Sequence, residues 1–325
     1  MSGPKVVITD HVFPSLEIER AQLGALGAEI VVMQATSDGQ LVDVVTDADA
    51  LLVCYAPVTR RVIDRLDRCR VIARYGIGVD NVDVGAATAR GIVVTNVPDY
   101  CVDEVSDHAL ALLLGCARRL AFLDRRVRGG RWDARDAQPM HRLRGQLLGL
   151  IGFGKIPRRL AGKARALGLD LLAFDPYVTA EEMTAHGATK VALDDLLARS
   201  DFVSVHAPLV ADTRGLIGEA ALRAMKPTAY LINTSRGPLV SFDAVVRALR
   251  EGWIAGAALD VLETEPPAAA GTFGDLDMLL LTPHVAFYSE EAVQELQHKA
   301  VDSVVRVLSG EAPRYPVNAV RPSPR

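Results

Sequence analysis

A glycine-rich segment in the middle of the chain, Gly149 to Pro157, has the residue types of a phosphate-binding loop. It follows an apolar run and opens an amphipathic one. Gly152 and Gly154 would let the backbone approach a pyrophosphate at a helix N-terminus. Asp175 ends the next apolar run about 20 residues later, where a carboxylate can hold a ribose diol. This spacing predicts a dinucleotide-binding βαβ unit.

Pro157 stands where the third glycine of that fingerprint is expected. Proline is tolerated in the first turn of a helix, because the N–H that it lacks would have no partner within the helix. The amides of Lys155 and Ile156 therefore remain able to face phosphate. What the replacement puts in question is the close packing of helix against strand that a glycine would allow.

Three later segments each present a reactive side chain just after an apolar run. Arg236 offers a planar, two-pronged donor suited to a carboxylate. Glu265 precedes two prolines in a stiff loop, and His284 follows a proline and could carry a proton. The carboxyl ends of parallel strands share one edge of a sheet, where ligands bind. Taken singly, each residue has a plain alternative: a surface arginine, a solvated acid or a structural histidine.

The composition is that of a globular protein large enough for two domains. The chain has 325 residues, of which 50% are hydrophobic and 23% charged, with a net charge of −4. No basic surface favours nucleic acid or anionic lipid, and the longest apolar stretch, Ala109 to Cys116, is too short to span a bilayer. The four cysteines and the histidines lack metal-ligand spacing, so we expect no metal and a reducing, cytoplasmic location. The last five residues, 321–325, are expected to be disordered.

Strand-like and helix-like patterns alternate along the chain, which predicts parallel sheets covered on both faces. A first series of strands is followed by a long helix from about Val102 to Val127. A second series then surrounds the glycine-rich loop, in which a helix is expected over Arg158–Leu167, and a last helix covers Glu290 to Leu308. The expected strands are Lys5–Thr9, Glu29–Met33, Ala50–Cys54, Val71–Arg74 and Ile92–Thr95, then Gln146–Ile151, Asp170–Phe174, Lys190–Ala192, Phe202–Val205, Ala229–Ile232, Gly256–Val261 and Met278–Leu281.

Together these motifs resemble the D-2-hydroxyacid dehydrogenase family. The resemblance covers nearly the whole chain and includes Arg74 to Asp83, Val94 to Pro98, Val205 to Leu209, the glycine-rich loop and the three segments with Arg236, Glu265 and His284. The segments Cys54–Pro57, Asp99–Cys101 and His284–Ser289 look most like the branch that includes the C-terminal-binding-protein corepressors and their bacterial enzyme relatives.

The resemblance implies a role for each reactive residue. Arg236 would bind the carboxylate of a 2-oxo acid, and His284 would protonate the 2-oxo oxygen as hydride arrives. Glu265 would orient the imidazole and favour its charged form. Asp260 would orient the nicotinamide carboxamide. Asp175 would hold the adenosine ribose and repel a 2′-phosphate, which favours NAD over NADP.

The resemblance also implies further contacts. The backbone amides of Ile77 and Gly78 would take the other side of the substrate carboxylate, with Tyr55, Tyr75 and Gly76 beside them. The remaining cofactor contacts would be His206, Ala207, Pro208, Thr213 and Thr234, with His206 in a structural rather than a catalytic role.

The implied fold is α/β, with two doubly wound parallel-sheet domains. A flavodoxin-like substrate-binding domain would combine residues 1–99 and 286–325, and a Rossmann-type NAD-binding domain, 100–285, would be inserted into it. The active site would lie in the cleft, and closure would exclude water. Residues from about 100 to 148, including Arg131 to Asp133, would form a dimerisation arm, so we expect a homodimer.

Two other functions stay open. The first is an NADH-sensing binding protein like the corepressors, although the chain keeps Arg236, Glu265 and His284. The second is phosphoglycerate dehydrogenase, although Cys54 to Pro57 replaces the basic loop expected for a phosphorylated substrate. Short or aromatic 2-oxo acids, glyoxylate or hydroxypyruvate, fit better. The sequence does not choose among them, nor does it give the physiological direction.

Overall fold

The computed structural model describes residues 3–267, 273 and 276–320, and it divides into two compact units. One unit combines the chain up to Tyr100 with the chain from Ser289 onward, and the other runs from Cys101 to Tyr288. The assignment of one unit to substrate and the other to cofactor stays a prediction. The tail 321–325, expected to be disordered, lies outside the described residues.

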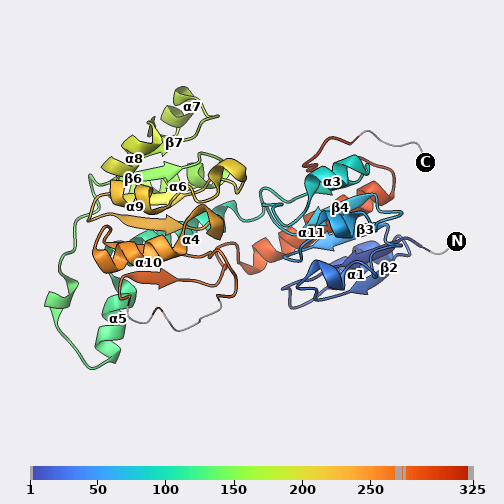
Figure 1. The fold of residues 1–325 in the computed structure, drawn as a ribbon, viewed down its shortest axis with the longest axis horizontal. Helices are drawn as coiled ribbons and strands as arrows, with labels where there is room; N and C mark the ends of the chain where they lie inside the picture. Colours follow the sequence, from blue (N-terminus) through green and yellow to red (C-terminus); the bar gives the residue numbers. More distant parts are fainter. Residues whose placement is uncertain (1–2, 268–272, 274–275, 321–325) are drawn as a thin grey trace. The chain divides into compact units, whose positions relative to one another are not determined.

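The first unit is built on a five-stranded, wholly parallel sheet in the order β2-β1-β3-β4-β5, which is the flavodoxin-like order. Helices α1 and α11 pack together, and α11 also packs on β3 and β4 (Figure 1). Helices α2 and α3 contribute to a core cluster with strand residues such as Val53 and Ile72. The elements are β1 Lys5–Ile8, α1 Glu17–Gly24, β2 Glu29–Val32, η1 Asp38–Gln40, β3 Ala50–Val53, α2 Arg60–Ile63, β4 Val71–Arg74, α3 Val84–Ala89, β5 Val93–Thr95 and α11 Glu290–Leu308.

The second unit has a seven-stranded parallel sheet in the order β12-β11-β10-β9-β6-β7-β8. Counted from β6, its first six strands follow the Rossmann order, and β12 adds one strand at the edge. The two sheets confirm the predicted fold class. The strands are β6 Leu147–Ile151, β7 Asp170–Phe174, β8 Ala188–Lys190, β9 Phe202–Val205, β10 Tyr230–Asn233, β11 Gly256–Leu259 and β12 Leu279–Leu281.

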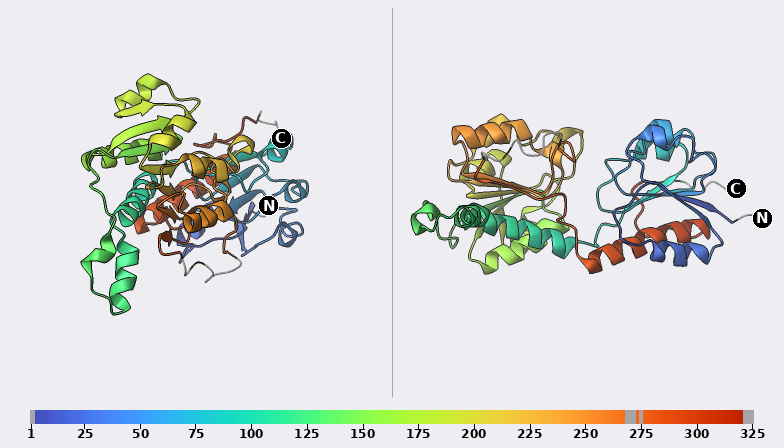
Figure 2. Two further views of the ribbon diagram at one scale, coloured as in Figure 1. Left: turned by 60° about the vertical axis from the view of Figure 1, so that its left-hand side comes forward. Right: turned by 90° about the horizontal axis from the view of Figure 1, so that it is seen from below.

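Helices cover both faces of this second sheet (Figure 2). Helices α4 and α6 enclose one core cluster, while α8, α9 and α10 enclose the other. Local signals set the helix ends, as in α10, where the Ser241 hydroxyl accepts from the Ala244 N–H and Gly252 ends the helix at φ +71°. The helices are α4 Val102–Ala117, α5 Leu120–Arg128, α6 Lys155–Ala166, α7 Ala180–Ala185, α8 Leu193–Arg199, α9 Glu219–Ala224 and α10 Phe242–Glu251, with 3₁₀ turns η2 Ala134–Ala137, η3 Ala211–Thr213 and η4 Gly237–Leu239.

The predicted long helix from Val102 to Val127 is wrong. It is divided at Arg119, which has φ +52° and separates α4 from α5. The Arg119 guanidinium donates to the Gln138 carbonyl at 2.6 Å and lies 4.5 Å from the Phe122 ring centroid. Gln138 is 19 residues away in the sequence, and Phe122 is about one helical turn away. The two contacts stabilise a bend that the pattern of apolar residues does not indicate.

Two smaller boundaries also differ from expectation. The strand expected at Lys190–Ala192 is β8, Ala188–Lys190, which pairs with β7 through Leu171 and Ala188. The helix expected from Arg158 begins at Lys155, directly after the glycine-rich loop.

Among the described residues, no helix combines the length and the apolar character that a bilayer crossing requires.

We expect Gly149→Ala to lower the free energy of unfolding by about 1–3 kcal/mol, because overpacking strains a filled core. A Cβ at Gly149, in β6, would lie 2.5 Å from Leu196 Cδ2 on α8. Gly24→Ala is the matched control, since a Cβ there meets no atom within 4 Å. Chemical denaturation of both variants checks this, and equal stabilities would contradict it.

Candidate active site

The loops that follow β6 and β9 meet where the strand order of the second sheet reverses. Gly152 has φ +89°, and a Cβ on it would lie 2.9 Å from the Ala207 nitrogen and the His206 carbonyl carbon. The His206 N–H donates to the Ile151 carbonyl at 2.7 Å. Only glycine satisfies both the backbone angle and this contact. Such a switch point is where open α/β sheets bind ligands.

The N-terminus of α6 lies at this switch point, and its first N–H groups have no acceptor within the helix. Gly154 precedes the helix, and a Cβ there would meet no protein atom within 4 Å. The N–H groups of Lys155 and Ile156 precede the first backbone bond of the helix, in which the Arg158 N–H donates to the Gly154 carbonyl. Pro157 lies in the first turn of the helix, where proline is tolerated, and it is buried there. This cradle fits a pyrophosphate.

The Asp175 carboxylate is fixed beside the glycine-rich loop by backbone amides. It accepts from the Phe153 N–H at 2.9 Å, from the Tyr177 N–H at 2.8 Å and from the Val178 N–H at 3.3 Å. The charge is therefore held at the end of β7, next to the loop that the cofactor phosphates would approach. A ribose diol could donate to the lone pairs that remain.

The loop after β9 contains the other predicted cofactor residues. Burial lowers the pKa of His206 to about 4, so the imidazole is neutral near neutral pH, and its Nε2 lies 2.8 Å from the Ser204 hydroxyl. The Thr213 hydroxyl donates to the Pro208 carbonyl at 2.6 Å and closes the loop. Ala207 is buried at the contact with Gly152. Their part in cofactor binding stays a prediction.

Arg236 is positioned by a turn at the end of β10. The Asn233 amide donates to the Arg236 carbonyl at 2.9 Å, and Asn233 Oδ1 accepts from the Ser235 N–H at 3.0 Å. The Thr234 hydroxyl is buried, and within the described part of the chain it has no hydrogen-bond partner. A buried polar atom without a partner is unfavourable, so Thr234 fits a residue that contacts a bound group.

His284 and Glu265 are in close contact. His284 Nδ1 lies 2.6 Å from Glu265 Oε2, while Glu265 Oε1 accepts from the Leu262 N–H at 2.8 Å. Burial alone would raise the pKa of Glu265, but the hydrogen bond and charge of His284, with smaller contributions from Leu262 and Arg236, lower it overall. An ionised carboxylate only accepts hydrogen bonds. Nδ1 therefore carries hydrogen, and Nε2 is the nitrogen that can exchange a proton.

Asp260 anchors the loop that contains His284. It follows β11 and is 2% exposed. Its carboxylate accepts from the N–H groups of Val285 and Ala286, both at 2.9 Å, and from the Thr282 hydroxyl at 2.5 Å, while its carbonyl accepts from the His284 N–H at 2.7 Å. His284 has φ +53°, a conformation that a residue without such support rarely adopts.

The predicted substrate residues lie in the first unit. Asp10 accepts from the N–H groups of Cys54 and Tyr55 at 3.0 and 2.6 Å, which fixes the loop after β3. The loop after β4 is held by Asn96, whose amide donates to the Ile77 carbonyl at 2.7 Å. Within the described residues, the N–H groups of Ile77 and Gly78 donate to no protein acceptor. They could therefore bind an anion, although this role stays a prediction.

The two predicted substrate tyrosines differ in their surroundings. Tyr55 is 42% exposed, whereas Tyr75 is 2% exposed and donates its hydroxyl to Glu19 Oε1 at 2.8 Å. Gly76 adopts φ +146° beneath the side chain of Arg74, which leaves no room for a Cβ. Sequence reasoning missed Asp10 and Asn96, which hold these loops, and the contact of Thr282 with Asp260 in the loop of His284. An acid or amide directly after a strand is the signal that could have indicated Asp10 and Asn96.

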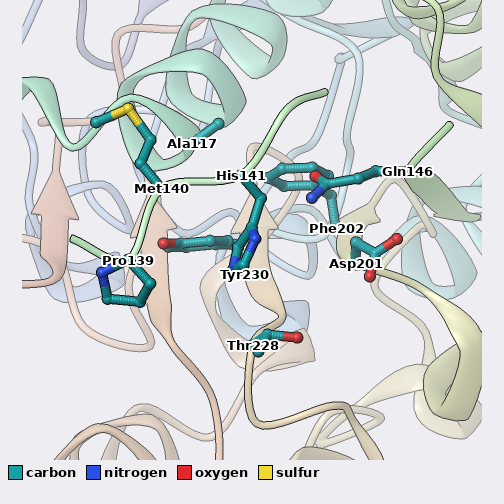
Figure 3. Close-up of a pocket in the computed structure, with 9 residues that line it drawn as sticks. All are labelled: Ala117, Pro139, Met140, His141, Gln146, Asp201, Phe202, Thr228 and Tyr230. Carbon is teal, nitrogen blue, oxygen red and sulfur yellow. The ribbon is translucent and has the colours of Figure 1, made fainter. Parts of the chain in front are cut away.

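A separate pocket of the second unit lies at the opposite edge of its sheet (Figure 3). Gln146, Asp201 and Thr228 contribute to it from positions just before strands, together with Tyr230 in β10. The candidate active site, in contrast, is built from residues that follow strands. The pocket therefore does not belong to it.

Comparison with known proteins identifies the family of this chain. The family model described as the D-isomer specific 2-hydroxyacid dehydrogenase, NAD binding domain, matches residues 110–286. A glyoxylate reductase of Thermococcus litoralis is 38% identical over 292 residues, 88% of each chain. A D-3-phosphoglycerate dehydrogenase of Archaeoglobus fulgidus is 36% identical over 300 residues, 91% of this chain but 57% of the relative.

Among solved structures, a D-lactate dehydrogenase of Aquifex aeolicus, complexed with NAD and lactic acid, superposes with a TM-score of 0.85. It is 27% identical, and the match covers 94% of this chain and 96% of that one. The family model and the relatives show that the chain belongs to the D-isomer-specific 2-hydroxyacid dehydrogenase family. It is an oxidoreductase with a nicotinamide cofactor.

We expect Gly152→Ala and Gly154→Ala to separate folding from cofactor binding. A Cβ at Gly152 meets the backbone of the neighbouring loop, so that variant should lose both stability and NADH binding. A Cβ at Gly154 meets no protein atom but would fill the phosphate cradle. Gly154→Ala should therefore keep its melting temperature and bind NADH at least about tenfold more weakly. Thermal melts and NADH fluorescence titrations check this, and unchanged NADH affinity in Gly154→Ala would contradict it.

Proposed function

We propose that this enzyme reduces a small, unphosphorylated 2-oxo acid, glyoxylate or hydroxypyruvate, with NADH and catalyses the reverse oxidation. The product is the 2-hydroxy acid, of D configuration where C2 is chiral. The contact between His284 and Glu265 is the observation that carries the proposal. It supports a proton-exchanging role for Nε2 of His284, which follows β12 at the carboxyl edge of the sheet that contains the glycine-rich loop. When bound there, the cofactor supplies or accepts the hydride.

In this proposal His284 is the general acid of reduction and the general base of oxidation. Its Nε2 gives a proton to the 2-oxo oxygen as negative charge develops there. Glu265 stays ionised and accepts from Nδ1, which fixes the ring orientation and stabilises the charged imidazolium before transfer. Arg236 binds the substrate carboxylate and polarises the 2-oxo group. The amides of Ile77 and Gly78 stay predicted donors to the carboxylate.

NAD rather than NADP is the proposed cofactor. The Asp175 carboxylate is fixed by three backbone amides and would repel a 2′-phosphate, and the adjoining Pro176 and Tyr177 supply no cation. Thr234 is available to a bound group through its buried, unpartnered hydroxyl. Asp260 can still accept from the carboxamide, because three donors do not exhaust the acceptor sites of its two oxygens.

The choice of an unphosphorylated acid is supported by the loop after β3. Cys54, Tyr55 and Ala56 bring no positive charge to this loop, and Tyr55 is exposed on it. Glyoxylate reductases are among the relatives that this chain matches over most of their length. Phosphoglycerate is therefore the less favoured substrate.

We expect a panel of 2-oxo acids to give NADH oxidation with glyoxylate or hydroxypyruvate and much less with 3-phosphohydroxypyruvate or with NADPH. Arg236→Ala should lower kcat/KM by about 100-fold or more, since a charged hydrogen-bond partner of the carboxylate is lost. The readout is the absorbance of NADH in a steady-state assay.

Tight NADH binding without turnover of any acid would contradict the proposal and favour an NADH-sensing binding protein. Turnover confined to the phosphorylated acid would favour phosphoglycerate dehydrogenase instead.

Glu265→Gln should lower kcat for reduction by about 100-fold, because the neutral amide no longer stabilises the imidazolium. Reduction needs protonated His284 and slows as pH rises. Without the carboxylate, the pH at which the rate falls should move to a lower value. Glu263→Gln, two residues away, is the matched control and should change neither quantity. An unshifted pH–rate profile in Glu265→Gln would show that Glu265 does not support the charged form.

We further propose a homodimer formed by the arm that follows α4. The exposed apolar side chains Leu120, Val127 and Trp132 gather on this segment, and Trp132 is 88% exposed. Helix α5 projects away from the sheet layers of its own unit (Figure 1). Large exposed aromatic groups of this kind typically bury themselves in an interface. We also propose a reducing, cytoplasmic location, which fits four cysteines that are all buried.

Trp132→Ala should weaken the dimer by about 2 kcal/mol, a roughly 30-fold rise in its dissociation constant, as expected for an interfacial aromatic anchor. Analytical ultracentrifugation over a concentration series measures this. Tyr177→Ala is the matched control, since Tyr177 is 92% exposed but lies outside the arm. A monomeric wild-type protein would contradict the proposal.

A further inference from the structure

A chain of hydrogen bonds connects α4 to the loop that contains His284. His108, on α4, places its Nε2 3.0 Å from the Thr282 hydroxyl and 3.6 Å from Asp260 Oδ1. The Thr282 hydroxyl in turn donates to Asp260 Oδ1 at 2.5 Å. The side chains of His108 and Asp260 are 22% and 1% exposed, and Thr282 is partly buried.

The direction of this chain follows from the donors available. A hydroxyl has one hydrogen, and the acceptor-only carboxylate of Asp260 takes it. Thr282 can therefore only accept from His108, so Nε2 must carry the hydrogen of the imidazole. Both the Nε2–H tautomer and the imidazolium satisfy this requirement. The contact thus persists whether His108 is neutral or charged.

The chain ends on the group that anchors the His284 loop. The oxygen that accepts from Thr282, Asp260 Oδ1, also accepts from the Val285 N–H, and Oδ2 accepts from the Ala286 N–H. Rotation of this carboxylate would break contacts on both sides of His284. His108 and Thr282 oppose that rotation from the side of the sheet covered by α4.

We propose that His108 is a positioning residue for His284. Its Nε2–H fixes the Thr282 hydroxyl and through it the Asp260 carboxylate, which holds the backbone of the catalytic loop at the conformation that directs His284 toward substrate. This inference rests on the proposed role of His284 as the acid–base group. His108 itself touches neither substrate nor cofactor in this scheme.

The test compares variants that keep or remove the donor. Gln places an amide nitrogen near the position of Nε2, so His108→Gln should retain at least a third of wild-type kcat. His108→Leu and Thr282→Val should each lower kcat about tenfold, with NADH affinity within twofold of wild type. Because both act through one chain, the double variant should be no slower than the slower single variant. His298→Leu, at an exposed histidine on α11, is the control and should match wild type.

Equal losses in His108→Gln and His108→Leu would overturn the proposal, because the imidazole itself rather than its donor would then matter. Unchanged kcat in His108→Leu would overturn it as well. Multiplicative effects in the double variant would show two independent contributions and no chain.

A second measurement separates this inference from the proposed function. Hydrogen–deuterium exchange of the full-length protein without substrate reports the Val285 and Ala286 amides directly. Exchange across residues 282–288 should be at least tenfold faster in His108→Leu and unchanged in His108→Gln. This result would support the positioning role even if the wild-type protein reduced no 2-oxo acid. Equal protection in all variants would overturn it.

Discussion

Removing a carboxylate from water requires several hydrogen-bond donors in return, and the Asp260 carboxylate finds them in the loop that contains His284. Two backbone amides and a threonine hydroxyl converge on it, and its own carbonyl accepts from the histidine backbone. Satisfying this one buried charge thereby determines the backbone of the loop, including the positive φ of His284. Glu265 then orients the ring that this backbone presents.

The same principle operates at other strand ends of the two sheets. Polar side chains bind backbone amides of the adjoining loop and so fix its shape: Asp175 holds the glycine-rich loop, and Asn233 holds the turn of Arg236. In the other unit, Asp10 holds the loop of Tyr55. At the carboxyl edge of a parallel sheet, the backbone N–H groups of the loops have no strand partner. Side chains of Asp and Asn can accept from these N–H groups, which is why such residues are found there.

The expectations that failed share a physical cause. Apolar periodicity continues from α4 through Arg119, so the pattern predicted one helix, but contacts of Arg119 with Gln138 and Phe122 stabilise a bend. Likewise, no local pattern indicated the contact between Thr282 and His108, because 174 residues separate them. Interactions between distant segments are invisible to local pattern.

The sequence by itself determined the fold class, most strand positions and the family, because hydrophobic period, glycine spacing and strand-end chemistry are local properties. It also singled out Arg236, Glu265 and His284 as candidates. Only the tertiary structure decided that Glu265 contacts His284 through Nδ1, that Asp260 anchors the loop, and that Tyr75 is buried against Glu19. These contacts join loops that follow separate strands. Strand order and packing, rather than proximity in the sequence, determine which loops come into contact.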